Sequence, residues 1–214
     1  MANIVVLHGL YMHGVVMKPL AERLKKKGHT VQVISYNSLR INEGLLFKRI
    51  HRCLSVSKKN VVLGHSLGGI LAVHFANHHQ DINTPVDSIV TIGSPLQGAS
   101  IAKEIQNKKL GFILGSSKKQ GLVDVVKLTA TCPLGSIAGT LPIGLRPPMI
   151  RDHQPSDGTV TVQETFLPEL TDHLCLKYSH TSLLYATETA NQIDYFISNH
   201  KFDRENMKVS DEVV

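Results

Sequence analysis

Short runs of apolar, mostly β-branched residues alternate along the chain with segments in which apolar residues recur at helical spacing. Runs of almost continuous apolar character are typical of strands that are buried on both faces of a parallel sheet. These runs predict strands over residues 3–8, 30–35, 60–65, 87–93, 135–139 and 173–178. The helical spacing predicts helices over residues 17–28, 42–54, 68–79 and 182–199. The alternation predicts an α/β fold with a mostly parallel sheet of about six strands and helices on both faces.

One stretch, residues 96–134, interrupts this alternation. It is rich in Gly, Ser and Lys and holds two apolar islands, LGFIL and LVDVVKL. Connections of this length are uncommon inside a compact domain and are usually functional. We therefore expect a small cap insertion over 96–134 within a single domain spanning 1–214, while an ordinary crossover with one or two helices fits the same pattern.

Composition indicates an ordered globular protein, because 42% of the residues are apolar and 19% are charged. No apolar run approaches the roughly 18–20 residues that a membrane-spanning helix needs. The chain enters a strand pattern within its first residues and shows no secretory leader pattern, which predicts a cytoplasmic protein. The three cysteines, Cys53, Cys132 and Cys175, are odd in number and far apart, which favours reduced thiols over disulfides or a zinc site.

The net charge of +6 comes from 23 Lys and Arg residues against 17 Asp and Glu residues. The lysines form short clusters at predicted helix ends and loops, where they favour solvation and the helix dipole. A nucleic-acid surface needs a continuous basic stripe interleaved with aromatic residues, and aromatic residues make up only 5% of this chain. We therefore expect no nucleic-acid partner, while a transient contact with an anionic membrane surface stays open.

The segment VVLGHSLGGILA, residues 61–72, joins a predicted strand directly to a predicted helix through the pattern G-x-S-x-G. In this pattern the serine lies on a strained turn between strand and helix, so that its hydroxyl projects above the sheet edge. The start of the helix aims backbone N–H groups at an anion that forms near the serine. We predict that Ser66 is a nucleophile and that Leu67 supplies an oxyanion-hole N–H. A merely structural glycine-rich turn is the alternative.

A serine nucleophile needs a base, and the base needs a carboxylate that orients it. In a parallel sheet, functional groups collect beyond the carboxyl ends of the strands. His180 follows the strand 173–178 and is therefore the candidate base, whereas His173 lies at the start of that strand, at the opposite edge. Asp157, in the turn-like segment PSDGTV, is the candidate acid, with Asp152 as the nearest alternative.

The loop after the first strand, LHGLYMHG, is expected to supply the second oxyanion donor. Gly9 lets the backbone approach the substrate, and the N–H of Leu10 would be the donor. We expect His8 to brace this loop and Tyr11 to form part of the pocket wall. The turn of the G-x-S-x-G pattern, residues 64–68, is called the nucleophile elbow. His65 adjoins the nucleophile, and we expect the backbone of the elbow to hold the His65 side chain facing away from Ser66.

These motifs resemble those of α/β-hydrolases of the compact bacterial lipase and esterase type. The resemblance is carried by VVLHGL at the first strand, GHSLGG at the elbow, SDGTV near the acid and SHTSLLY around the base. TIGSPLQGAS, residues 91–100, is similar to the G-[ST]-P-x-x-G segment of lipase-like hydrolases, including those similar to inositol deacylases. Lipase-like members often carry His after this SP pair, where this chain has Leu96, a change that concerns the lining of the pocket.

The resemblance implies the α/β-hydrolase fold, a triad of Ser66, Asp157 and His180 in the chain order of that family, and an oxyanion hole at Leu10 and Leu67. It also implies acyl-enzyme chemistry without a cofactor or a metal. We expect a serine hydrolase that cleaves a carboxylic ester, either a small molecule or a lipid, through an acyl-Ser66 intermediate. The alternatives are an acyltransferase or thioesterase with the same triad, and a non-catalytic binding protein with this fold.

Overall fold

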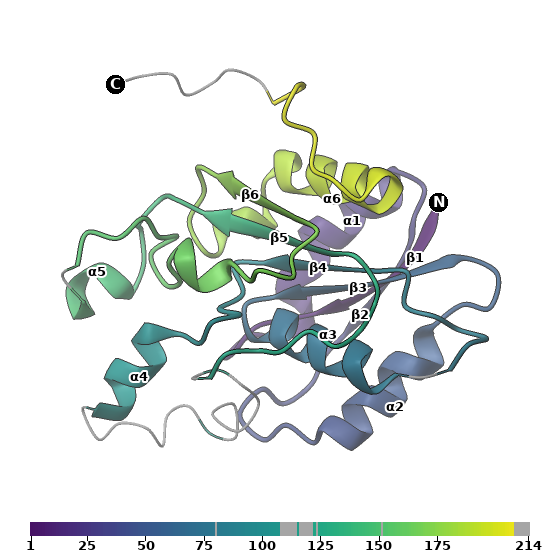
Figure 1. Ribbon diagram of the computed structural model, residues 1–214, viewed down its shortest axis with the longest axis horizontal. Coiled ribbons are helices and arrows are strands. Elements are labelled where there is room, and N and C mark those ends of the chain that lie inside the picture. Colours follow the sequence, from purple (N-terminus) through teal and green to yellow (C-terminus); the bar gives the residue numbers. More distant parts are fainter. Residues whose placement is uncertain (80, 108–114, 116–121, 123, 151, 208–214) are drawn as a thin grey trace.

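Six strands form one sheet in the order β2-β1-β3-β4-β5-β6 (Figure 1). The computed structural model describes residues 1–79, 81–107, 115, 122, 124–150 and 152–207. The strands are β1 (Ala2–Leu7), β2 (Thr30–Ile34), β3 (Lys59–His65), β4 (Ser88–Ile92), β5 (Leu134–Gly139) and β6 (Asp172–Leu176). Every neighbouring pair is parallel, which confirms the predicted sheet.

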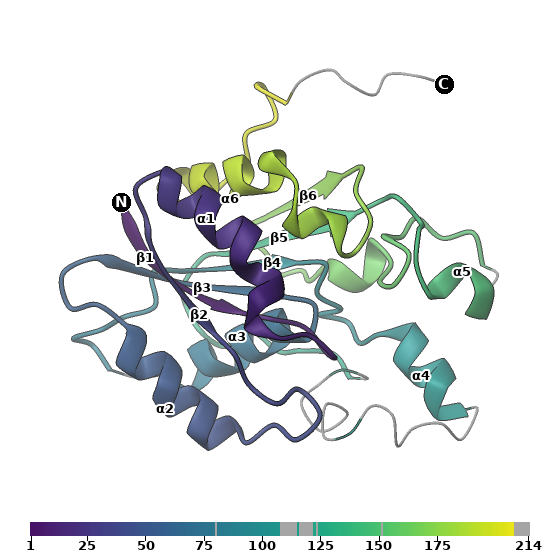
Figure 2. The same cartoon turned by 180° about the vertical axis from the view of Figure 1, so that it is seen from behind.

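Helices cover both faces of the sheet, as predicted from the sequence. The helices are α1 (Lys18–Lys26), α2 (Glu43–Cys53), α3 (Leu67–His78), α4 (Ser100–Asn107), α5 (Arg146–Met149) and α6 (Thr187–Asn199), with 3-10 turns η1 (Gly14–Met17), η3 (Gln163–Thr165) and η4 (Ser182–Leu184). Helices α1 and α6 lie on one face, and α2 and α3 lie on the other (Figures 1 and 2). Helices α4 and α5 lie beyond the carboxyl ends of β4 and β5.

The central strands are buried on both sides, which explains their continuous apolar runs. All six residues of β1 are buried. Ile4 and Val6 pack with α1 and α6, whereas Val5 and Leu7 pack with α2 and α3, because successive side chains of a strand point to opposite faces. Leu7 is paired with Gly64 of β3, so the carboxyl ends of the two strands meet at one edge of the sheet.

Most predicted bounds differ from the observed ones by one or two residues, but the single helix predicted over 182–199 is wrong. That segment divides into the turn η4 and the helix α6. Ser182 Oγ accepts hydrogen bonds from the N–H and the O–H of Ser179, at 2.7 and 2.9 Å. Such local bonding competes with helix formation, and the backbone becomes extended at Ala186 (φ −76°, ψ 132°) before α6 begins.

The stretch for which a cap is expected, residues 96–134, lies in the connection between β4 and β5 and reaches the first residue of β5. Its described apolar residues belong to the same core cluster as α2 and α3; they include Leu96, Ala99, Ile101, Ala102, Leu122 and Val126. The cap stays a prediction, because residues 108–114, 116–121 and 123 lie outside the described part of the chain. No helix within the described ranges is long and apolar enough to span a membrane.

Candidate active site

Ser66 occupies the sharp turn between β3 and α3 that the G-x-S-x-G pattern predicts. Its backbone has φ 55° and ψ −125°, a region that residues other than glycine rarely occupy and that stores strain. Two hydrogen bonds hold this conformation: Ser66 N–H donates to the carbonyl of Ile92 at 2.9 Å, and Gly69 N–H donates to the carbonyl of Ser66 at 3.0 Å. The serine is partly exposed, whereas the residues around it are buried.

The glycines of the pattern are required by close packing around this turn. A Cβ atom on Gly64 would lie 2.2 Å from the carbonyl oxygen of Gly68, and one on Gly68 would lie 2.5 Å from the carbonyl oxygen of Leu7. Real Cβ atoms do not approach backbone so closely, so any side chain at either position would push β1, β3 and α3 apart. The spacing of the motif therefore follows from the approach of helix to strand.

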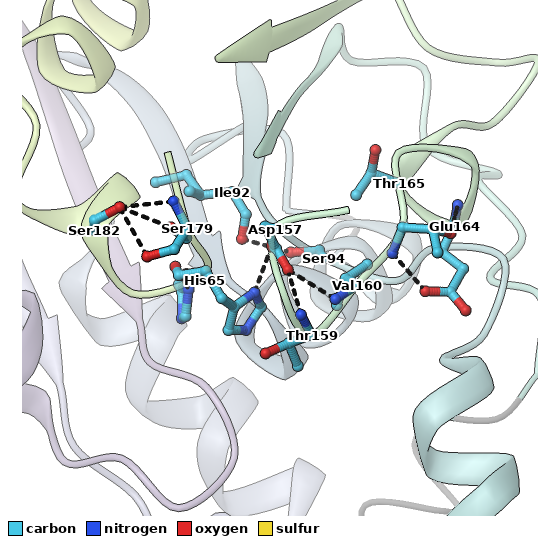
Figure 3. A network of polar contacts seen from close by, with 12 residues as sticks. His65, Ile92, Ser94, Asp157, Thr159, Val160, Glu164, Thr165, Ser179 and Ser182 are labelled. Carbon is cyan, nitrogen blue, oxygen red and sulfur yellow. Dashed lines mark hydrogen bonds and ion pairs between the residues drawn. The ribbon is translucent and has the colours of Figure 1, made fainter. Parts of the chain in front are cut away.

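Asp157 and His180 form a buried pair at the same edge of the sheet. His180 Nδ1 lies 2.6 Å from Asp157 Oδ2, and the backbone N–H of His180 donates to the carbonyl of Asp157 at 2.8 Å. The other carboxylate oxygen, Oδ1, accepts the N–H groups of Thr159 and Val160 (Figure 3). A carboxylate accepts hydrogen bonds, so Nδ1 carries a proton and Nε2 is left as the basic nitrogen of the neutral ring.

Asp152, the alternative acid, contacts a different partner. It forms an ion pair with Arg146, and about a third of its side chain is exposed. Asp157 is fully buried and lies on the loop between α5 and η3, in the connection from β5 to β6. The contact to His180 is therefore made by Asp157 rather than by its neighbour.

His65, the last residue of β3, links the elbow to this pair. Its Nε2 lies 2.9 Å from the carbonyl oxygen of His180, and the two rings are 4.6 Å apart, centroid to centroid. The expectation that His65 faces away from the nucleophile stays a prediction, but it did not include the packing of its ring against the candidate base. A buried imidazole needs a hydrogen-bond partner, and the backbone of residue 180 supplies one that sequence spacing does not reveal.

The segments that carry the two predicted oxyanion donors both adjoin Ser66. Leu67 is the first residue of α3, so its N–H has no acceptor within the helix and points out of its N-terminus. On the other side, a Cβ atom on Gly9 would lie only 3.0 Å from Ser66 Cβ. The loop that carries Leu10 therefore runs directly along the serine.

His8 braces this loop, which confirms the role expected for it. Its Nε2 accepts the N–H of Tyr36 at 3.1 Å, and its Nδ1 donates to the carbonyl of Gly9 at 2.9 Å. The hydroxyl of Tyr36 donates in turn to the carbonyl of His8. Burial lowers the pKa of His8 from its ordinary value of 6.5, so the neutral ring with its proton on Nδ1 is the stable form.

A pocket of about 570 Å³ lies beside the same loop. Tyr11, Tyr36 and Arg49 contribute to its lining, whereas Ser66 and His180 do not. The place of Tyr11 in the wall of the substrate pocket therefore stays a prediction. Residues of other apolar runs, which could line a site for an acyl chain, differ in their placement. Leu122 is in the core and Ile143 is exposed, while residues 110–114 lie outside the described part of the chain.

A polar cluster lies next to the loop that carries Asp157 (the Asp157 loop), and it was not predicted from the sequence. Glu164 is buried, and its carboxylate accepts the N–H of Ser100 at 2.6 Å and the N–H of Thr161 at 2.8 Å. Thr161 Oγ1 accepts the N–H of Glu164 in return. Arg146 forms an ion pair with Glu164. The cluster joins the start of α4 to the loop that carries Asp157. The spacing Thr-x-x-Glu, a capping-box pattern, is the signal that could have found it.

Metal and disulfide chemistry find no support in the described residues. No group of three or more His, Cys, Asp and Glu side chains among them is arranged to hold a metal ion. The three cysteines are free thiols, with Cys175 exposed.

A family model described as the PGAP1-like alpha/beta domain matches residues 22–129, just over half of the chain. The match includes Ser66 and Leu67 and ends before Asp157 and His180. The part of the chain that it covers therefore includes the elbow.

Curated relatives include two esterases of the same name. The pimeloyl-[acyl-carrier protein] methyl ester esterase of Vibrio vulnificus strain YJ016 is 28% identical over 181 residues, which cover 80% of this chain and 70% of that protein. The esterase of that name from strain CMCP6 is 32% identical over 105 residues, which cover 47% of this chain and 40% of that protein.

Solved structures show the same fold. The mature form of the Bacillus licheniformis lipase BlEst2 superposes with a TM-score of 0.67 at 19% identity, covering 92% of this chain and 90% of that one. The metagenomic carboxyl esterase MGS0156 superposes with a TM-score of 0.65 at 15% identity, covering 92% of this chain and 75% of that one. At these identities the similarity is one of fold, and it confirms the α/β-hydrolase fold.

Proposed function

We propose that this chain, which belongs to the PGAP1-like alpha/beta domain family, is a serine hydrolase that cleaves carboxylic esters through an acyl-Ser66 intermediate. One observation carries the proposal: a buried carboxylate–imidazole pair, Asp157 and His180, with Oδ2 and Nδ1 2.6 Å apart. It lies at the sheet edge where a strained turn presents Ser66. The two esterase relatives, and lipase and esterase structures of the same fold, support ester hydrolysis as the reaction.

In the proposed reaction, Ser66 Oγ attacks the acyl carbonyl carbon while His180 Nε2 takes the hydroxyl proton. The N–H groups of Leu10 and Leu67 hold the oxyanion of the tetrahedral intermediate. Breaking the ester bond leaves acyl-Ser66 and an alkoxide, which departs as the alcohol with the proton from His180. Water then loses a proton to His180 and attacks the acyl carbonyl carbon. The acyl–Oγ bond breaks, the carboxylic acid leaves, and His180 returns the proton to Ser66 Oγ. Asp157 keeps the ring of His180 in the required tautomer throughout.

The substrate class that we propose is a small-molecule or lipid acyl ester. The relatives act on a methyl ester of an acyl group, as their name states, and this chemistry needs only the groups proposed above. An acyltransferase or thioesterase would use the same acyl-Ser66 intermediate and would differ in the second step or in the leaving group. These alternatives are outcomes of the test below.

The test is intact mass after treatment with a fluorophosphonate probe, on the wild type, Ser66→Ala and Ser94→Ala. Ser94 is a fully buried serine near the elbow and serves as the matched control. We expect one adduct on the wild type and on Ser94→Ala, and none on Ser66→Ala. No adduct on a folded wild type would overturn the serine-hydrolase proposal and favour a binding protein.

A panel of p-nitrophenyl esters of increasing acyl length then defines the acyl preference. The same assay with an added alcohol acceptor, or with an acyl thioester in place of the ester, separates hydrolysis from acyl transfer and from thioester cleavage. Faster turnover with the acceptor present, and a new ester as product, would identify an acyltransferase.

A further inference from the structure

His65 is fully buried and contacts two other parts of the proposed site at once. Its Nε2 is hydrogen-bonded to the backbone carbonyl of His180, and the centroids of the two rings are 4.6 Å apart. Its Nδ1 faces the loop after β1, where a Cβ atom on Gly9 would lie 3.2 Å away. The side chain thus fills the space between the candidate base and the loop of the proposed oxyanion donor.

The hydrogen bonds assign the protons of this ring. A carbonyl oxygen only accepts, so Nε2 of His65 carries a proton and donates it to the carbonyl of His180. Its Nδ1 is buried and has no hydrogen-bond partner within the described part of the chain, and a proton there would be a buried donor without an acceptor. Burial, and then the charge of His180, hold the pKa of His65 well below its ordinary value of 6.5. His65 is therefore neutral, and the positive charge formed in the reaction belongs to His180.

Three hydrogen bonds hold residue 180 within the described residues, and they come from two directions. Two come from Asp157: one through the side chains at 2.6 Å, and one from the N–H of His180 to the carbonyl of Asp157 at 2.8 Å. The third comes from His65, at 2.9 Å. His65 belongs to β3 and is covalently joined to Ser66, so its bond ties the base to the strand that carries the nucleophile.

We propose that His65 is a positioning residue, whose Nε2–H sets the placement of His180 relative to Ser66. The inference rests on the proposed function, because it assigns His180 the role of base. If His65 acted only by packing, a side chain of similar volume could replace it. The proposed role also requires a hydrogen-bond donor at the position of Nε2, to hold His180 in place. A displacement of about 1 Å from a reactive geometry can cost about 10²-fold in rate.

The variants His65→Gln and His65→Asn test this distinction. Both are amides of similar polarity, but the glutamine amide nitrogen reaches the position of Nε2, whereas the asparagine amide nitrogen reaches only that of Nδ1. We expect His65→Asn to lower kcat for p-nitrophenyl butyrate by roughly 10- to 100-fold with KM little changed. We expect His65→Gln to restore most of that loss. Equal losses in the two variants, or wild-type kcat in folded His65→Asn, would overturn the proposal.

A second readout does not depend on turnover. The proton shared by His180 and Asp157 should give a far-downfield resonance in the proton NMR spectrum. We expect this resonance in the wild type and in His65→Gln, and its loss or broadening in His65→Asn. If the wild type neither reacts with the fluorophosphonate probe nor hydrolyses the ester, the proposed function fails, and the resonance still decides the placement of His180. An unchanged resonance in His65→Asn would then count against the proposal.

Discussion

The ring of Tyr36 stacks on the ring of His8, with centroids 4.2 Å apart and planes inclined by 14°. The stack holds His8 where its Nδ1–H bonds to the carbonyl of Gly9. The peptide unit between residues 9 and 10 is planar, so its C=O and N–H groups point in opposite directions. Fixing the carbonyl of Gly9 therefore also fixes the direction of the N–H of Leu10. This N–H is the second donor of the proposed oxyanion hole.

Replacing His8 by leucine should release this peptide. We expect His8→Leu to lower kcat by up to about 10²–10³-fold, the usual effect of losing one oxyanion donor. Tyr36→Phe keeps the stacked ring and removes only the hydroxyl bond, so its loss should be smaller. Steady-state kinetics with a p-nitrophenyl ester would measure both, with Tyr185→Phe at an exposed tyrosine as the control. Unchanged kcat in a folded His8→Leu variant would contradict this account of the loop.

The exchange Asp157→Asn should leave the loop in place and impair the base. The amide oxygen can still accept from Thr159 and Val160, but the amide nitrogen would oppose the proton on His180 Nδ1 and favour the wrong tautomer. We expect kcat to fall by roughly 10⁴-fold. Asp152→Asn, which alters only the ion pair to Arg146, should retain most of the activity. A larger loss in Asp152→Asn than in Asp157→Asn would reverse the assignment of the acid.

Acid should destabilise the fold through histidines that are buried or partly buried. Burial lowers the pKa values of His8, His65 and His173 in the folded protein. In the unfolded chain these rings titrate near about 6.5, so below that pH the unfolded state binds more protons than the folded one. The free energy of unfolding should therefore fall as the pH drops through about 6.5.

Urea unfolding over a pH series measures this dependence. His65→Gln removes one of the buried titrating rings, so its stability should change less steeply with pH than that of the wild type. His78→Gln, at an exposed histidine of α3, is the matched control for the substitution itself. Parallel curves for the wild type and His65→Gln would show that His65 contributes nothing to the acid dependence.

Glu164 should stabilise the junction between α4 and the Asp157 loop. Its carboxylate accepts backbone N–H groups from Ser100 and Thr161, and removing it would leave both donors, and part of the charge of Arg146, without a partner. We expect Glu164→Ala to lower the free energy of unfolding by roughly 2–4 kcal/mol, since hydrogen bonds to charged groups are worth more than neutral ones. Glu169→Ala, at an exposed glutamate, should change it little. Comparable urea midpoints for the two variants would refute the role of Glu164.

Features that depend on local pattern were predictable from the sequence. The buried strands follow from their continuous apolar runs, and the position of Ser66 follows from a glycine spacing that only a tight strand–helix approach requires. His180 was predictable because a parallel sheet gathers the residues that follow its strands at one edge. In each case the cause lies within a few residues or in a general rule of topology.

Features that depend on distant partners were not predictable in the same way. The direction of His65 is decided by a carbonyl 115 residues away, and the role of Glu164 by an N–H that lies 64 residues before it. The break before α6 is a local exception: Ser182 Oγ accepts hydrogen bonds from the N–H and the O–H of Ser179, and these bonds compete with helix geometry. Apolar periodicity carries no information about such contacts.

The order of the strands has a consequence for biosynthesis. From β4 onward, each new strand pairs with the one made just before it, and β6 forms the last edge of the sheet. A chain emerging from the ribosome can therefore extend the sheet strand by strand, with domains forming from the N-terminal side. Ser66 is placed early, whereas His180 arrives only with β6. A serine without its base is a poor nucleophile. Ser66 of the growing chain should therefore not attack esters until β6 has paired with β5.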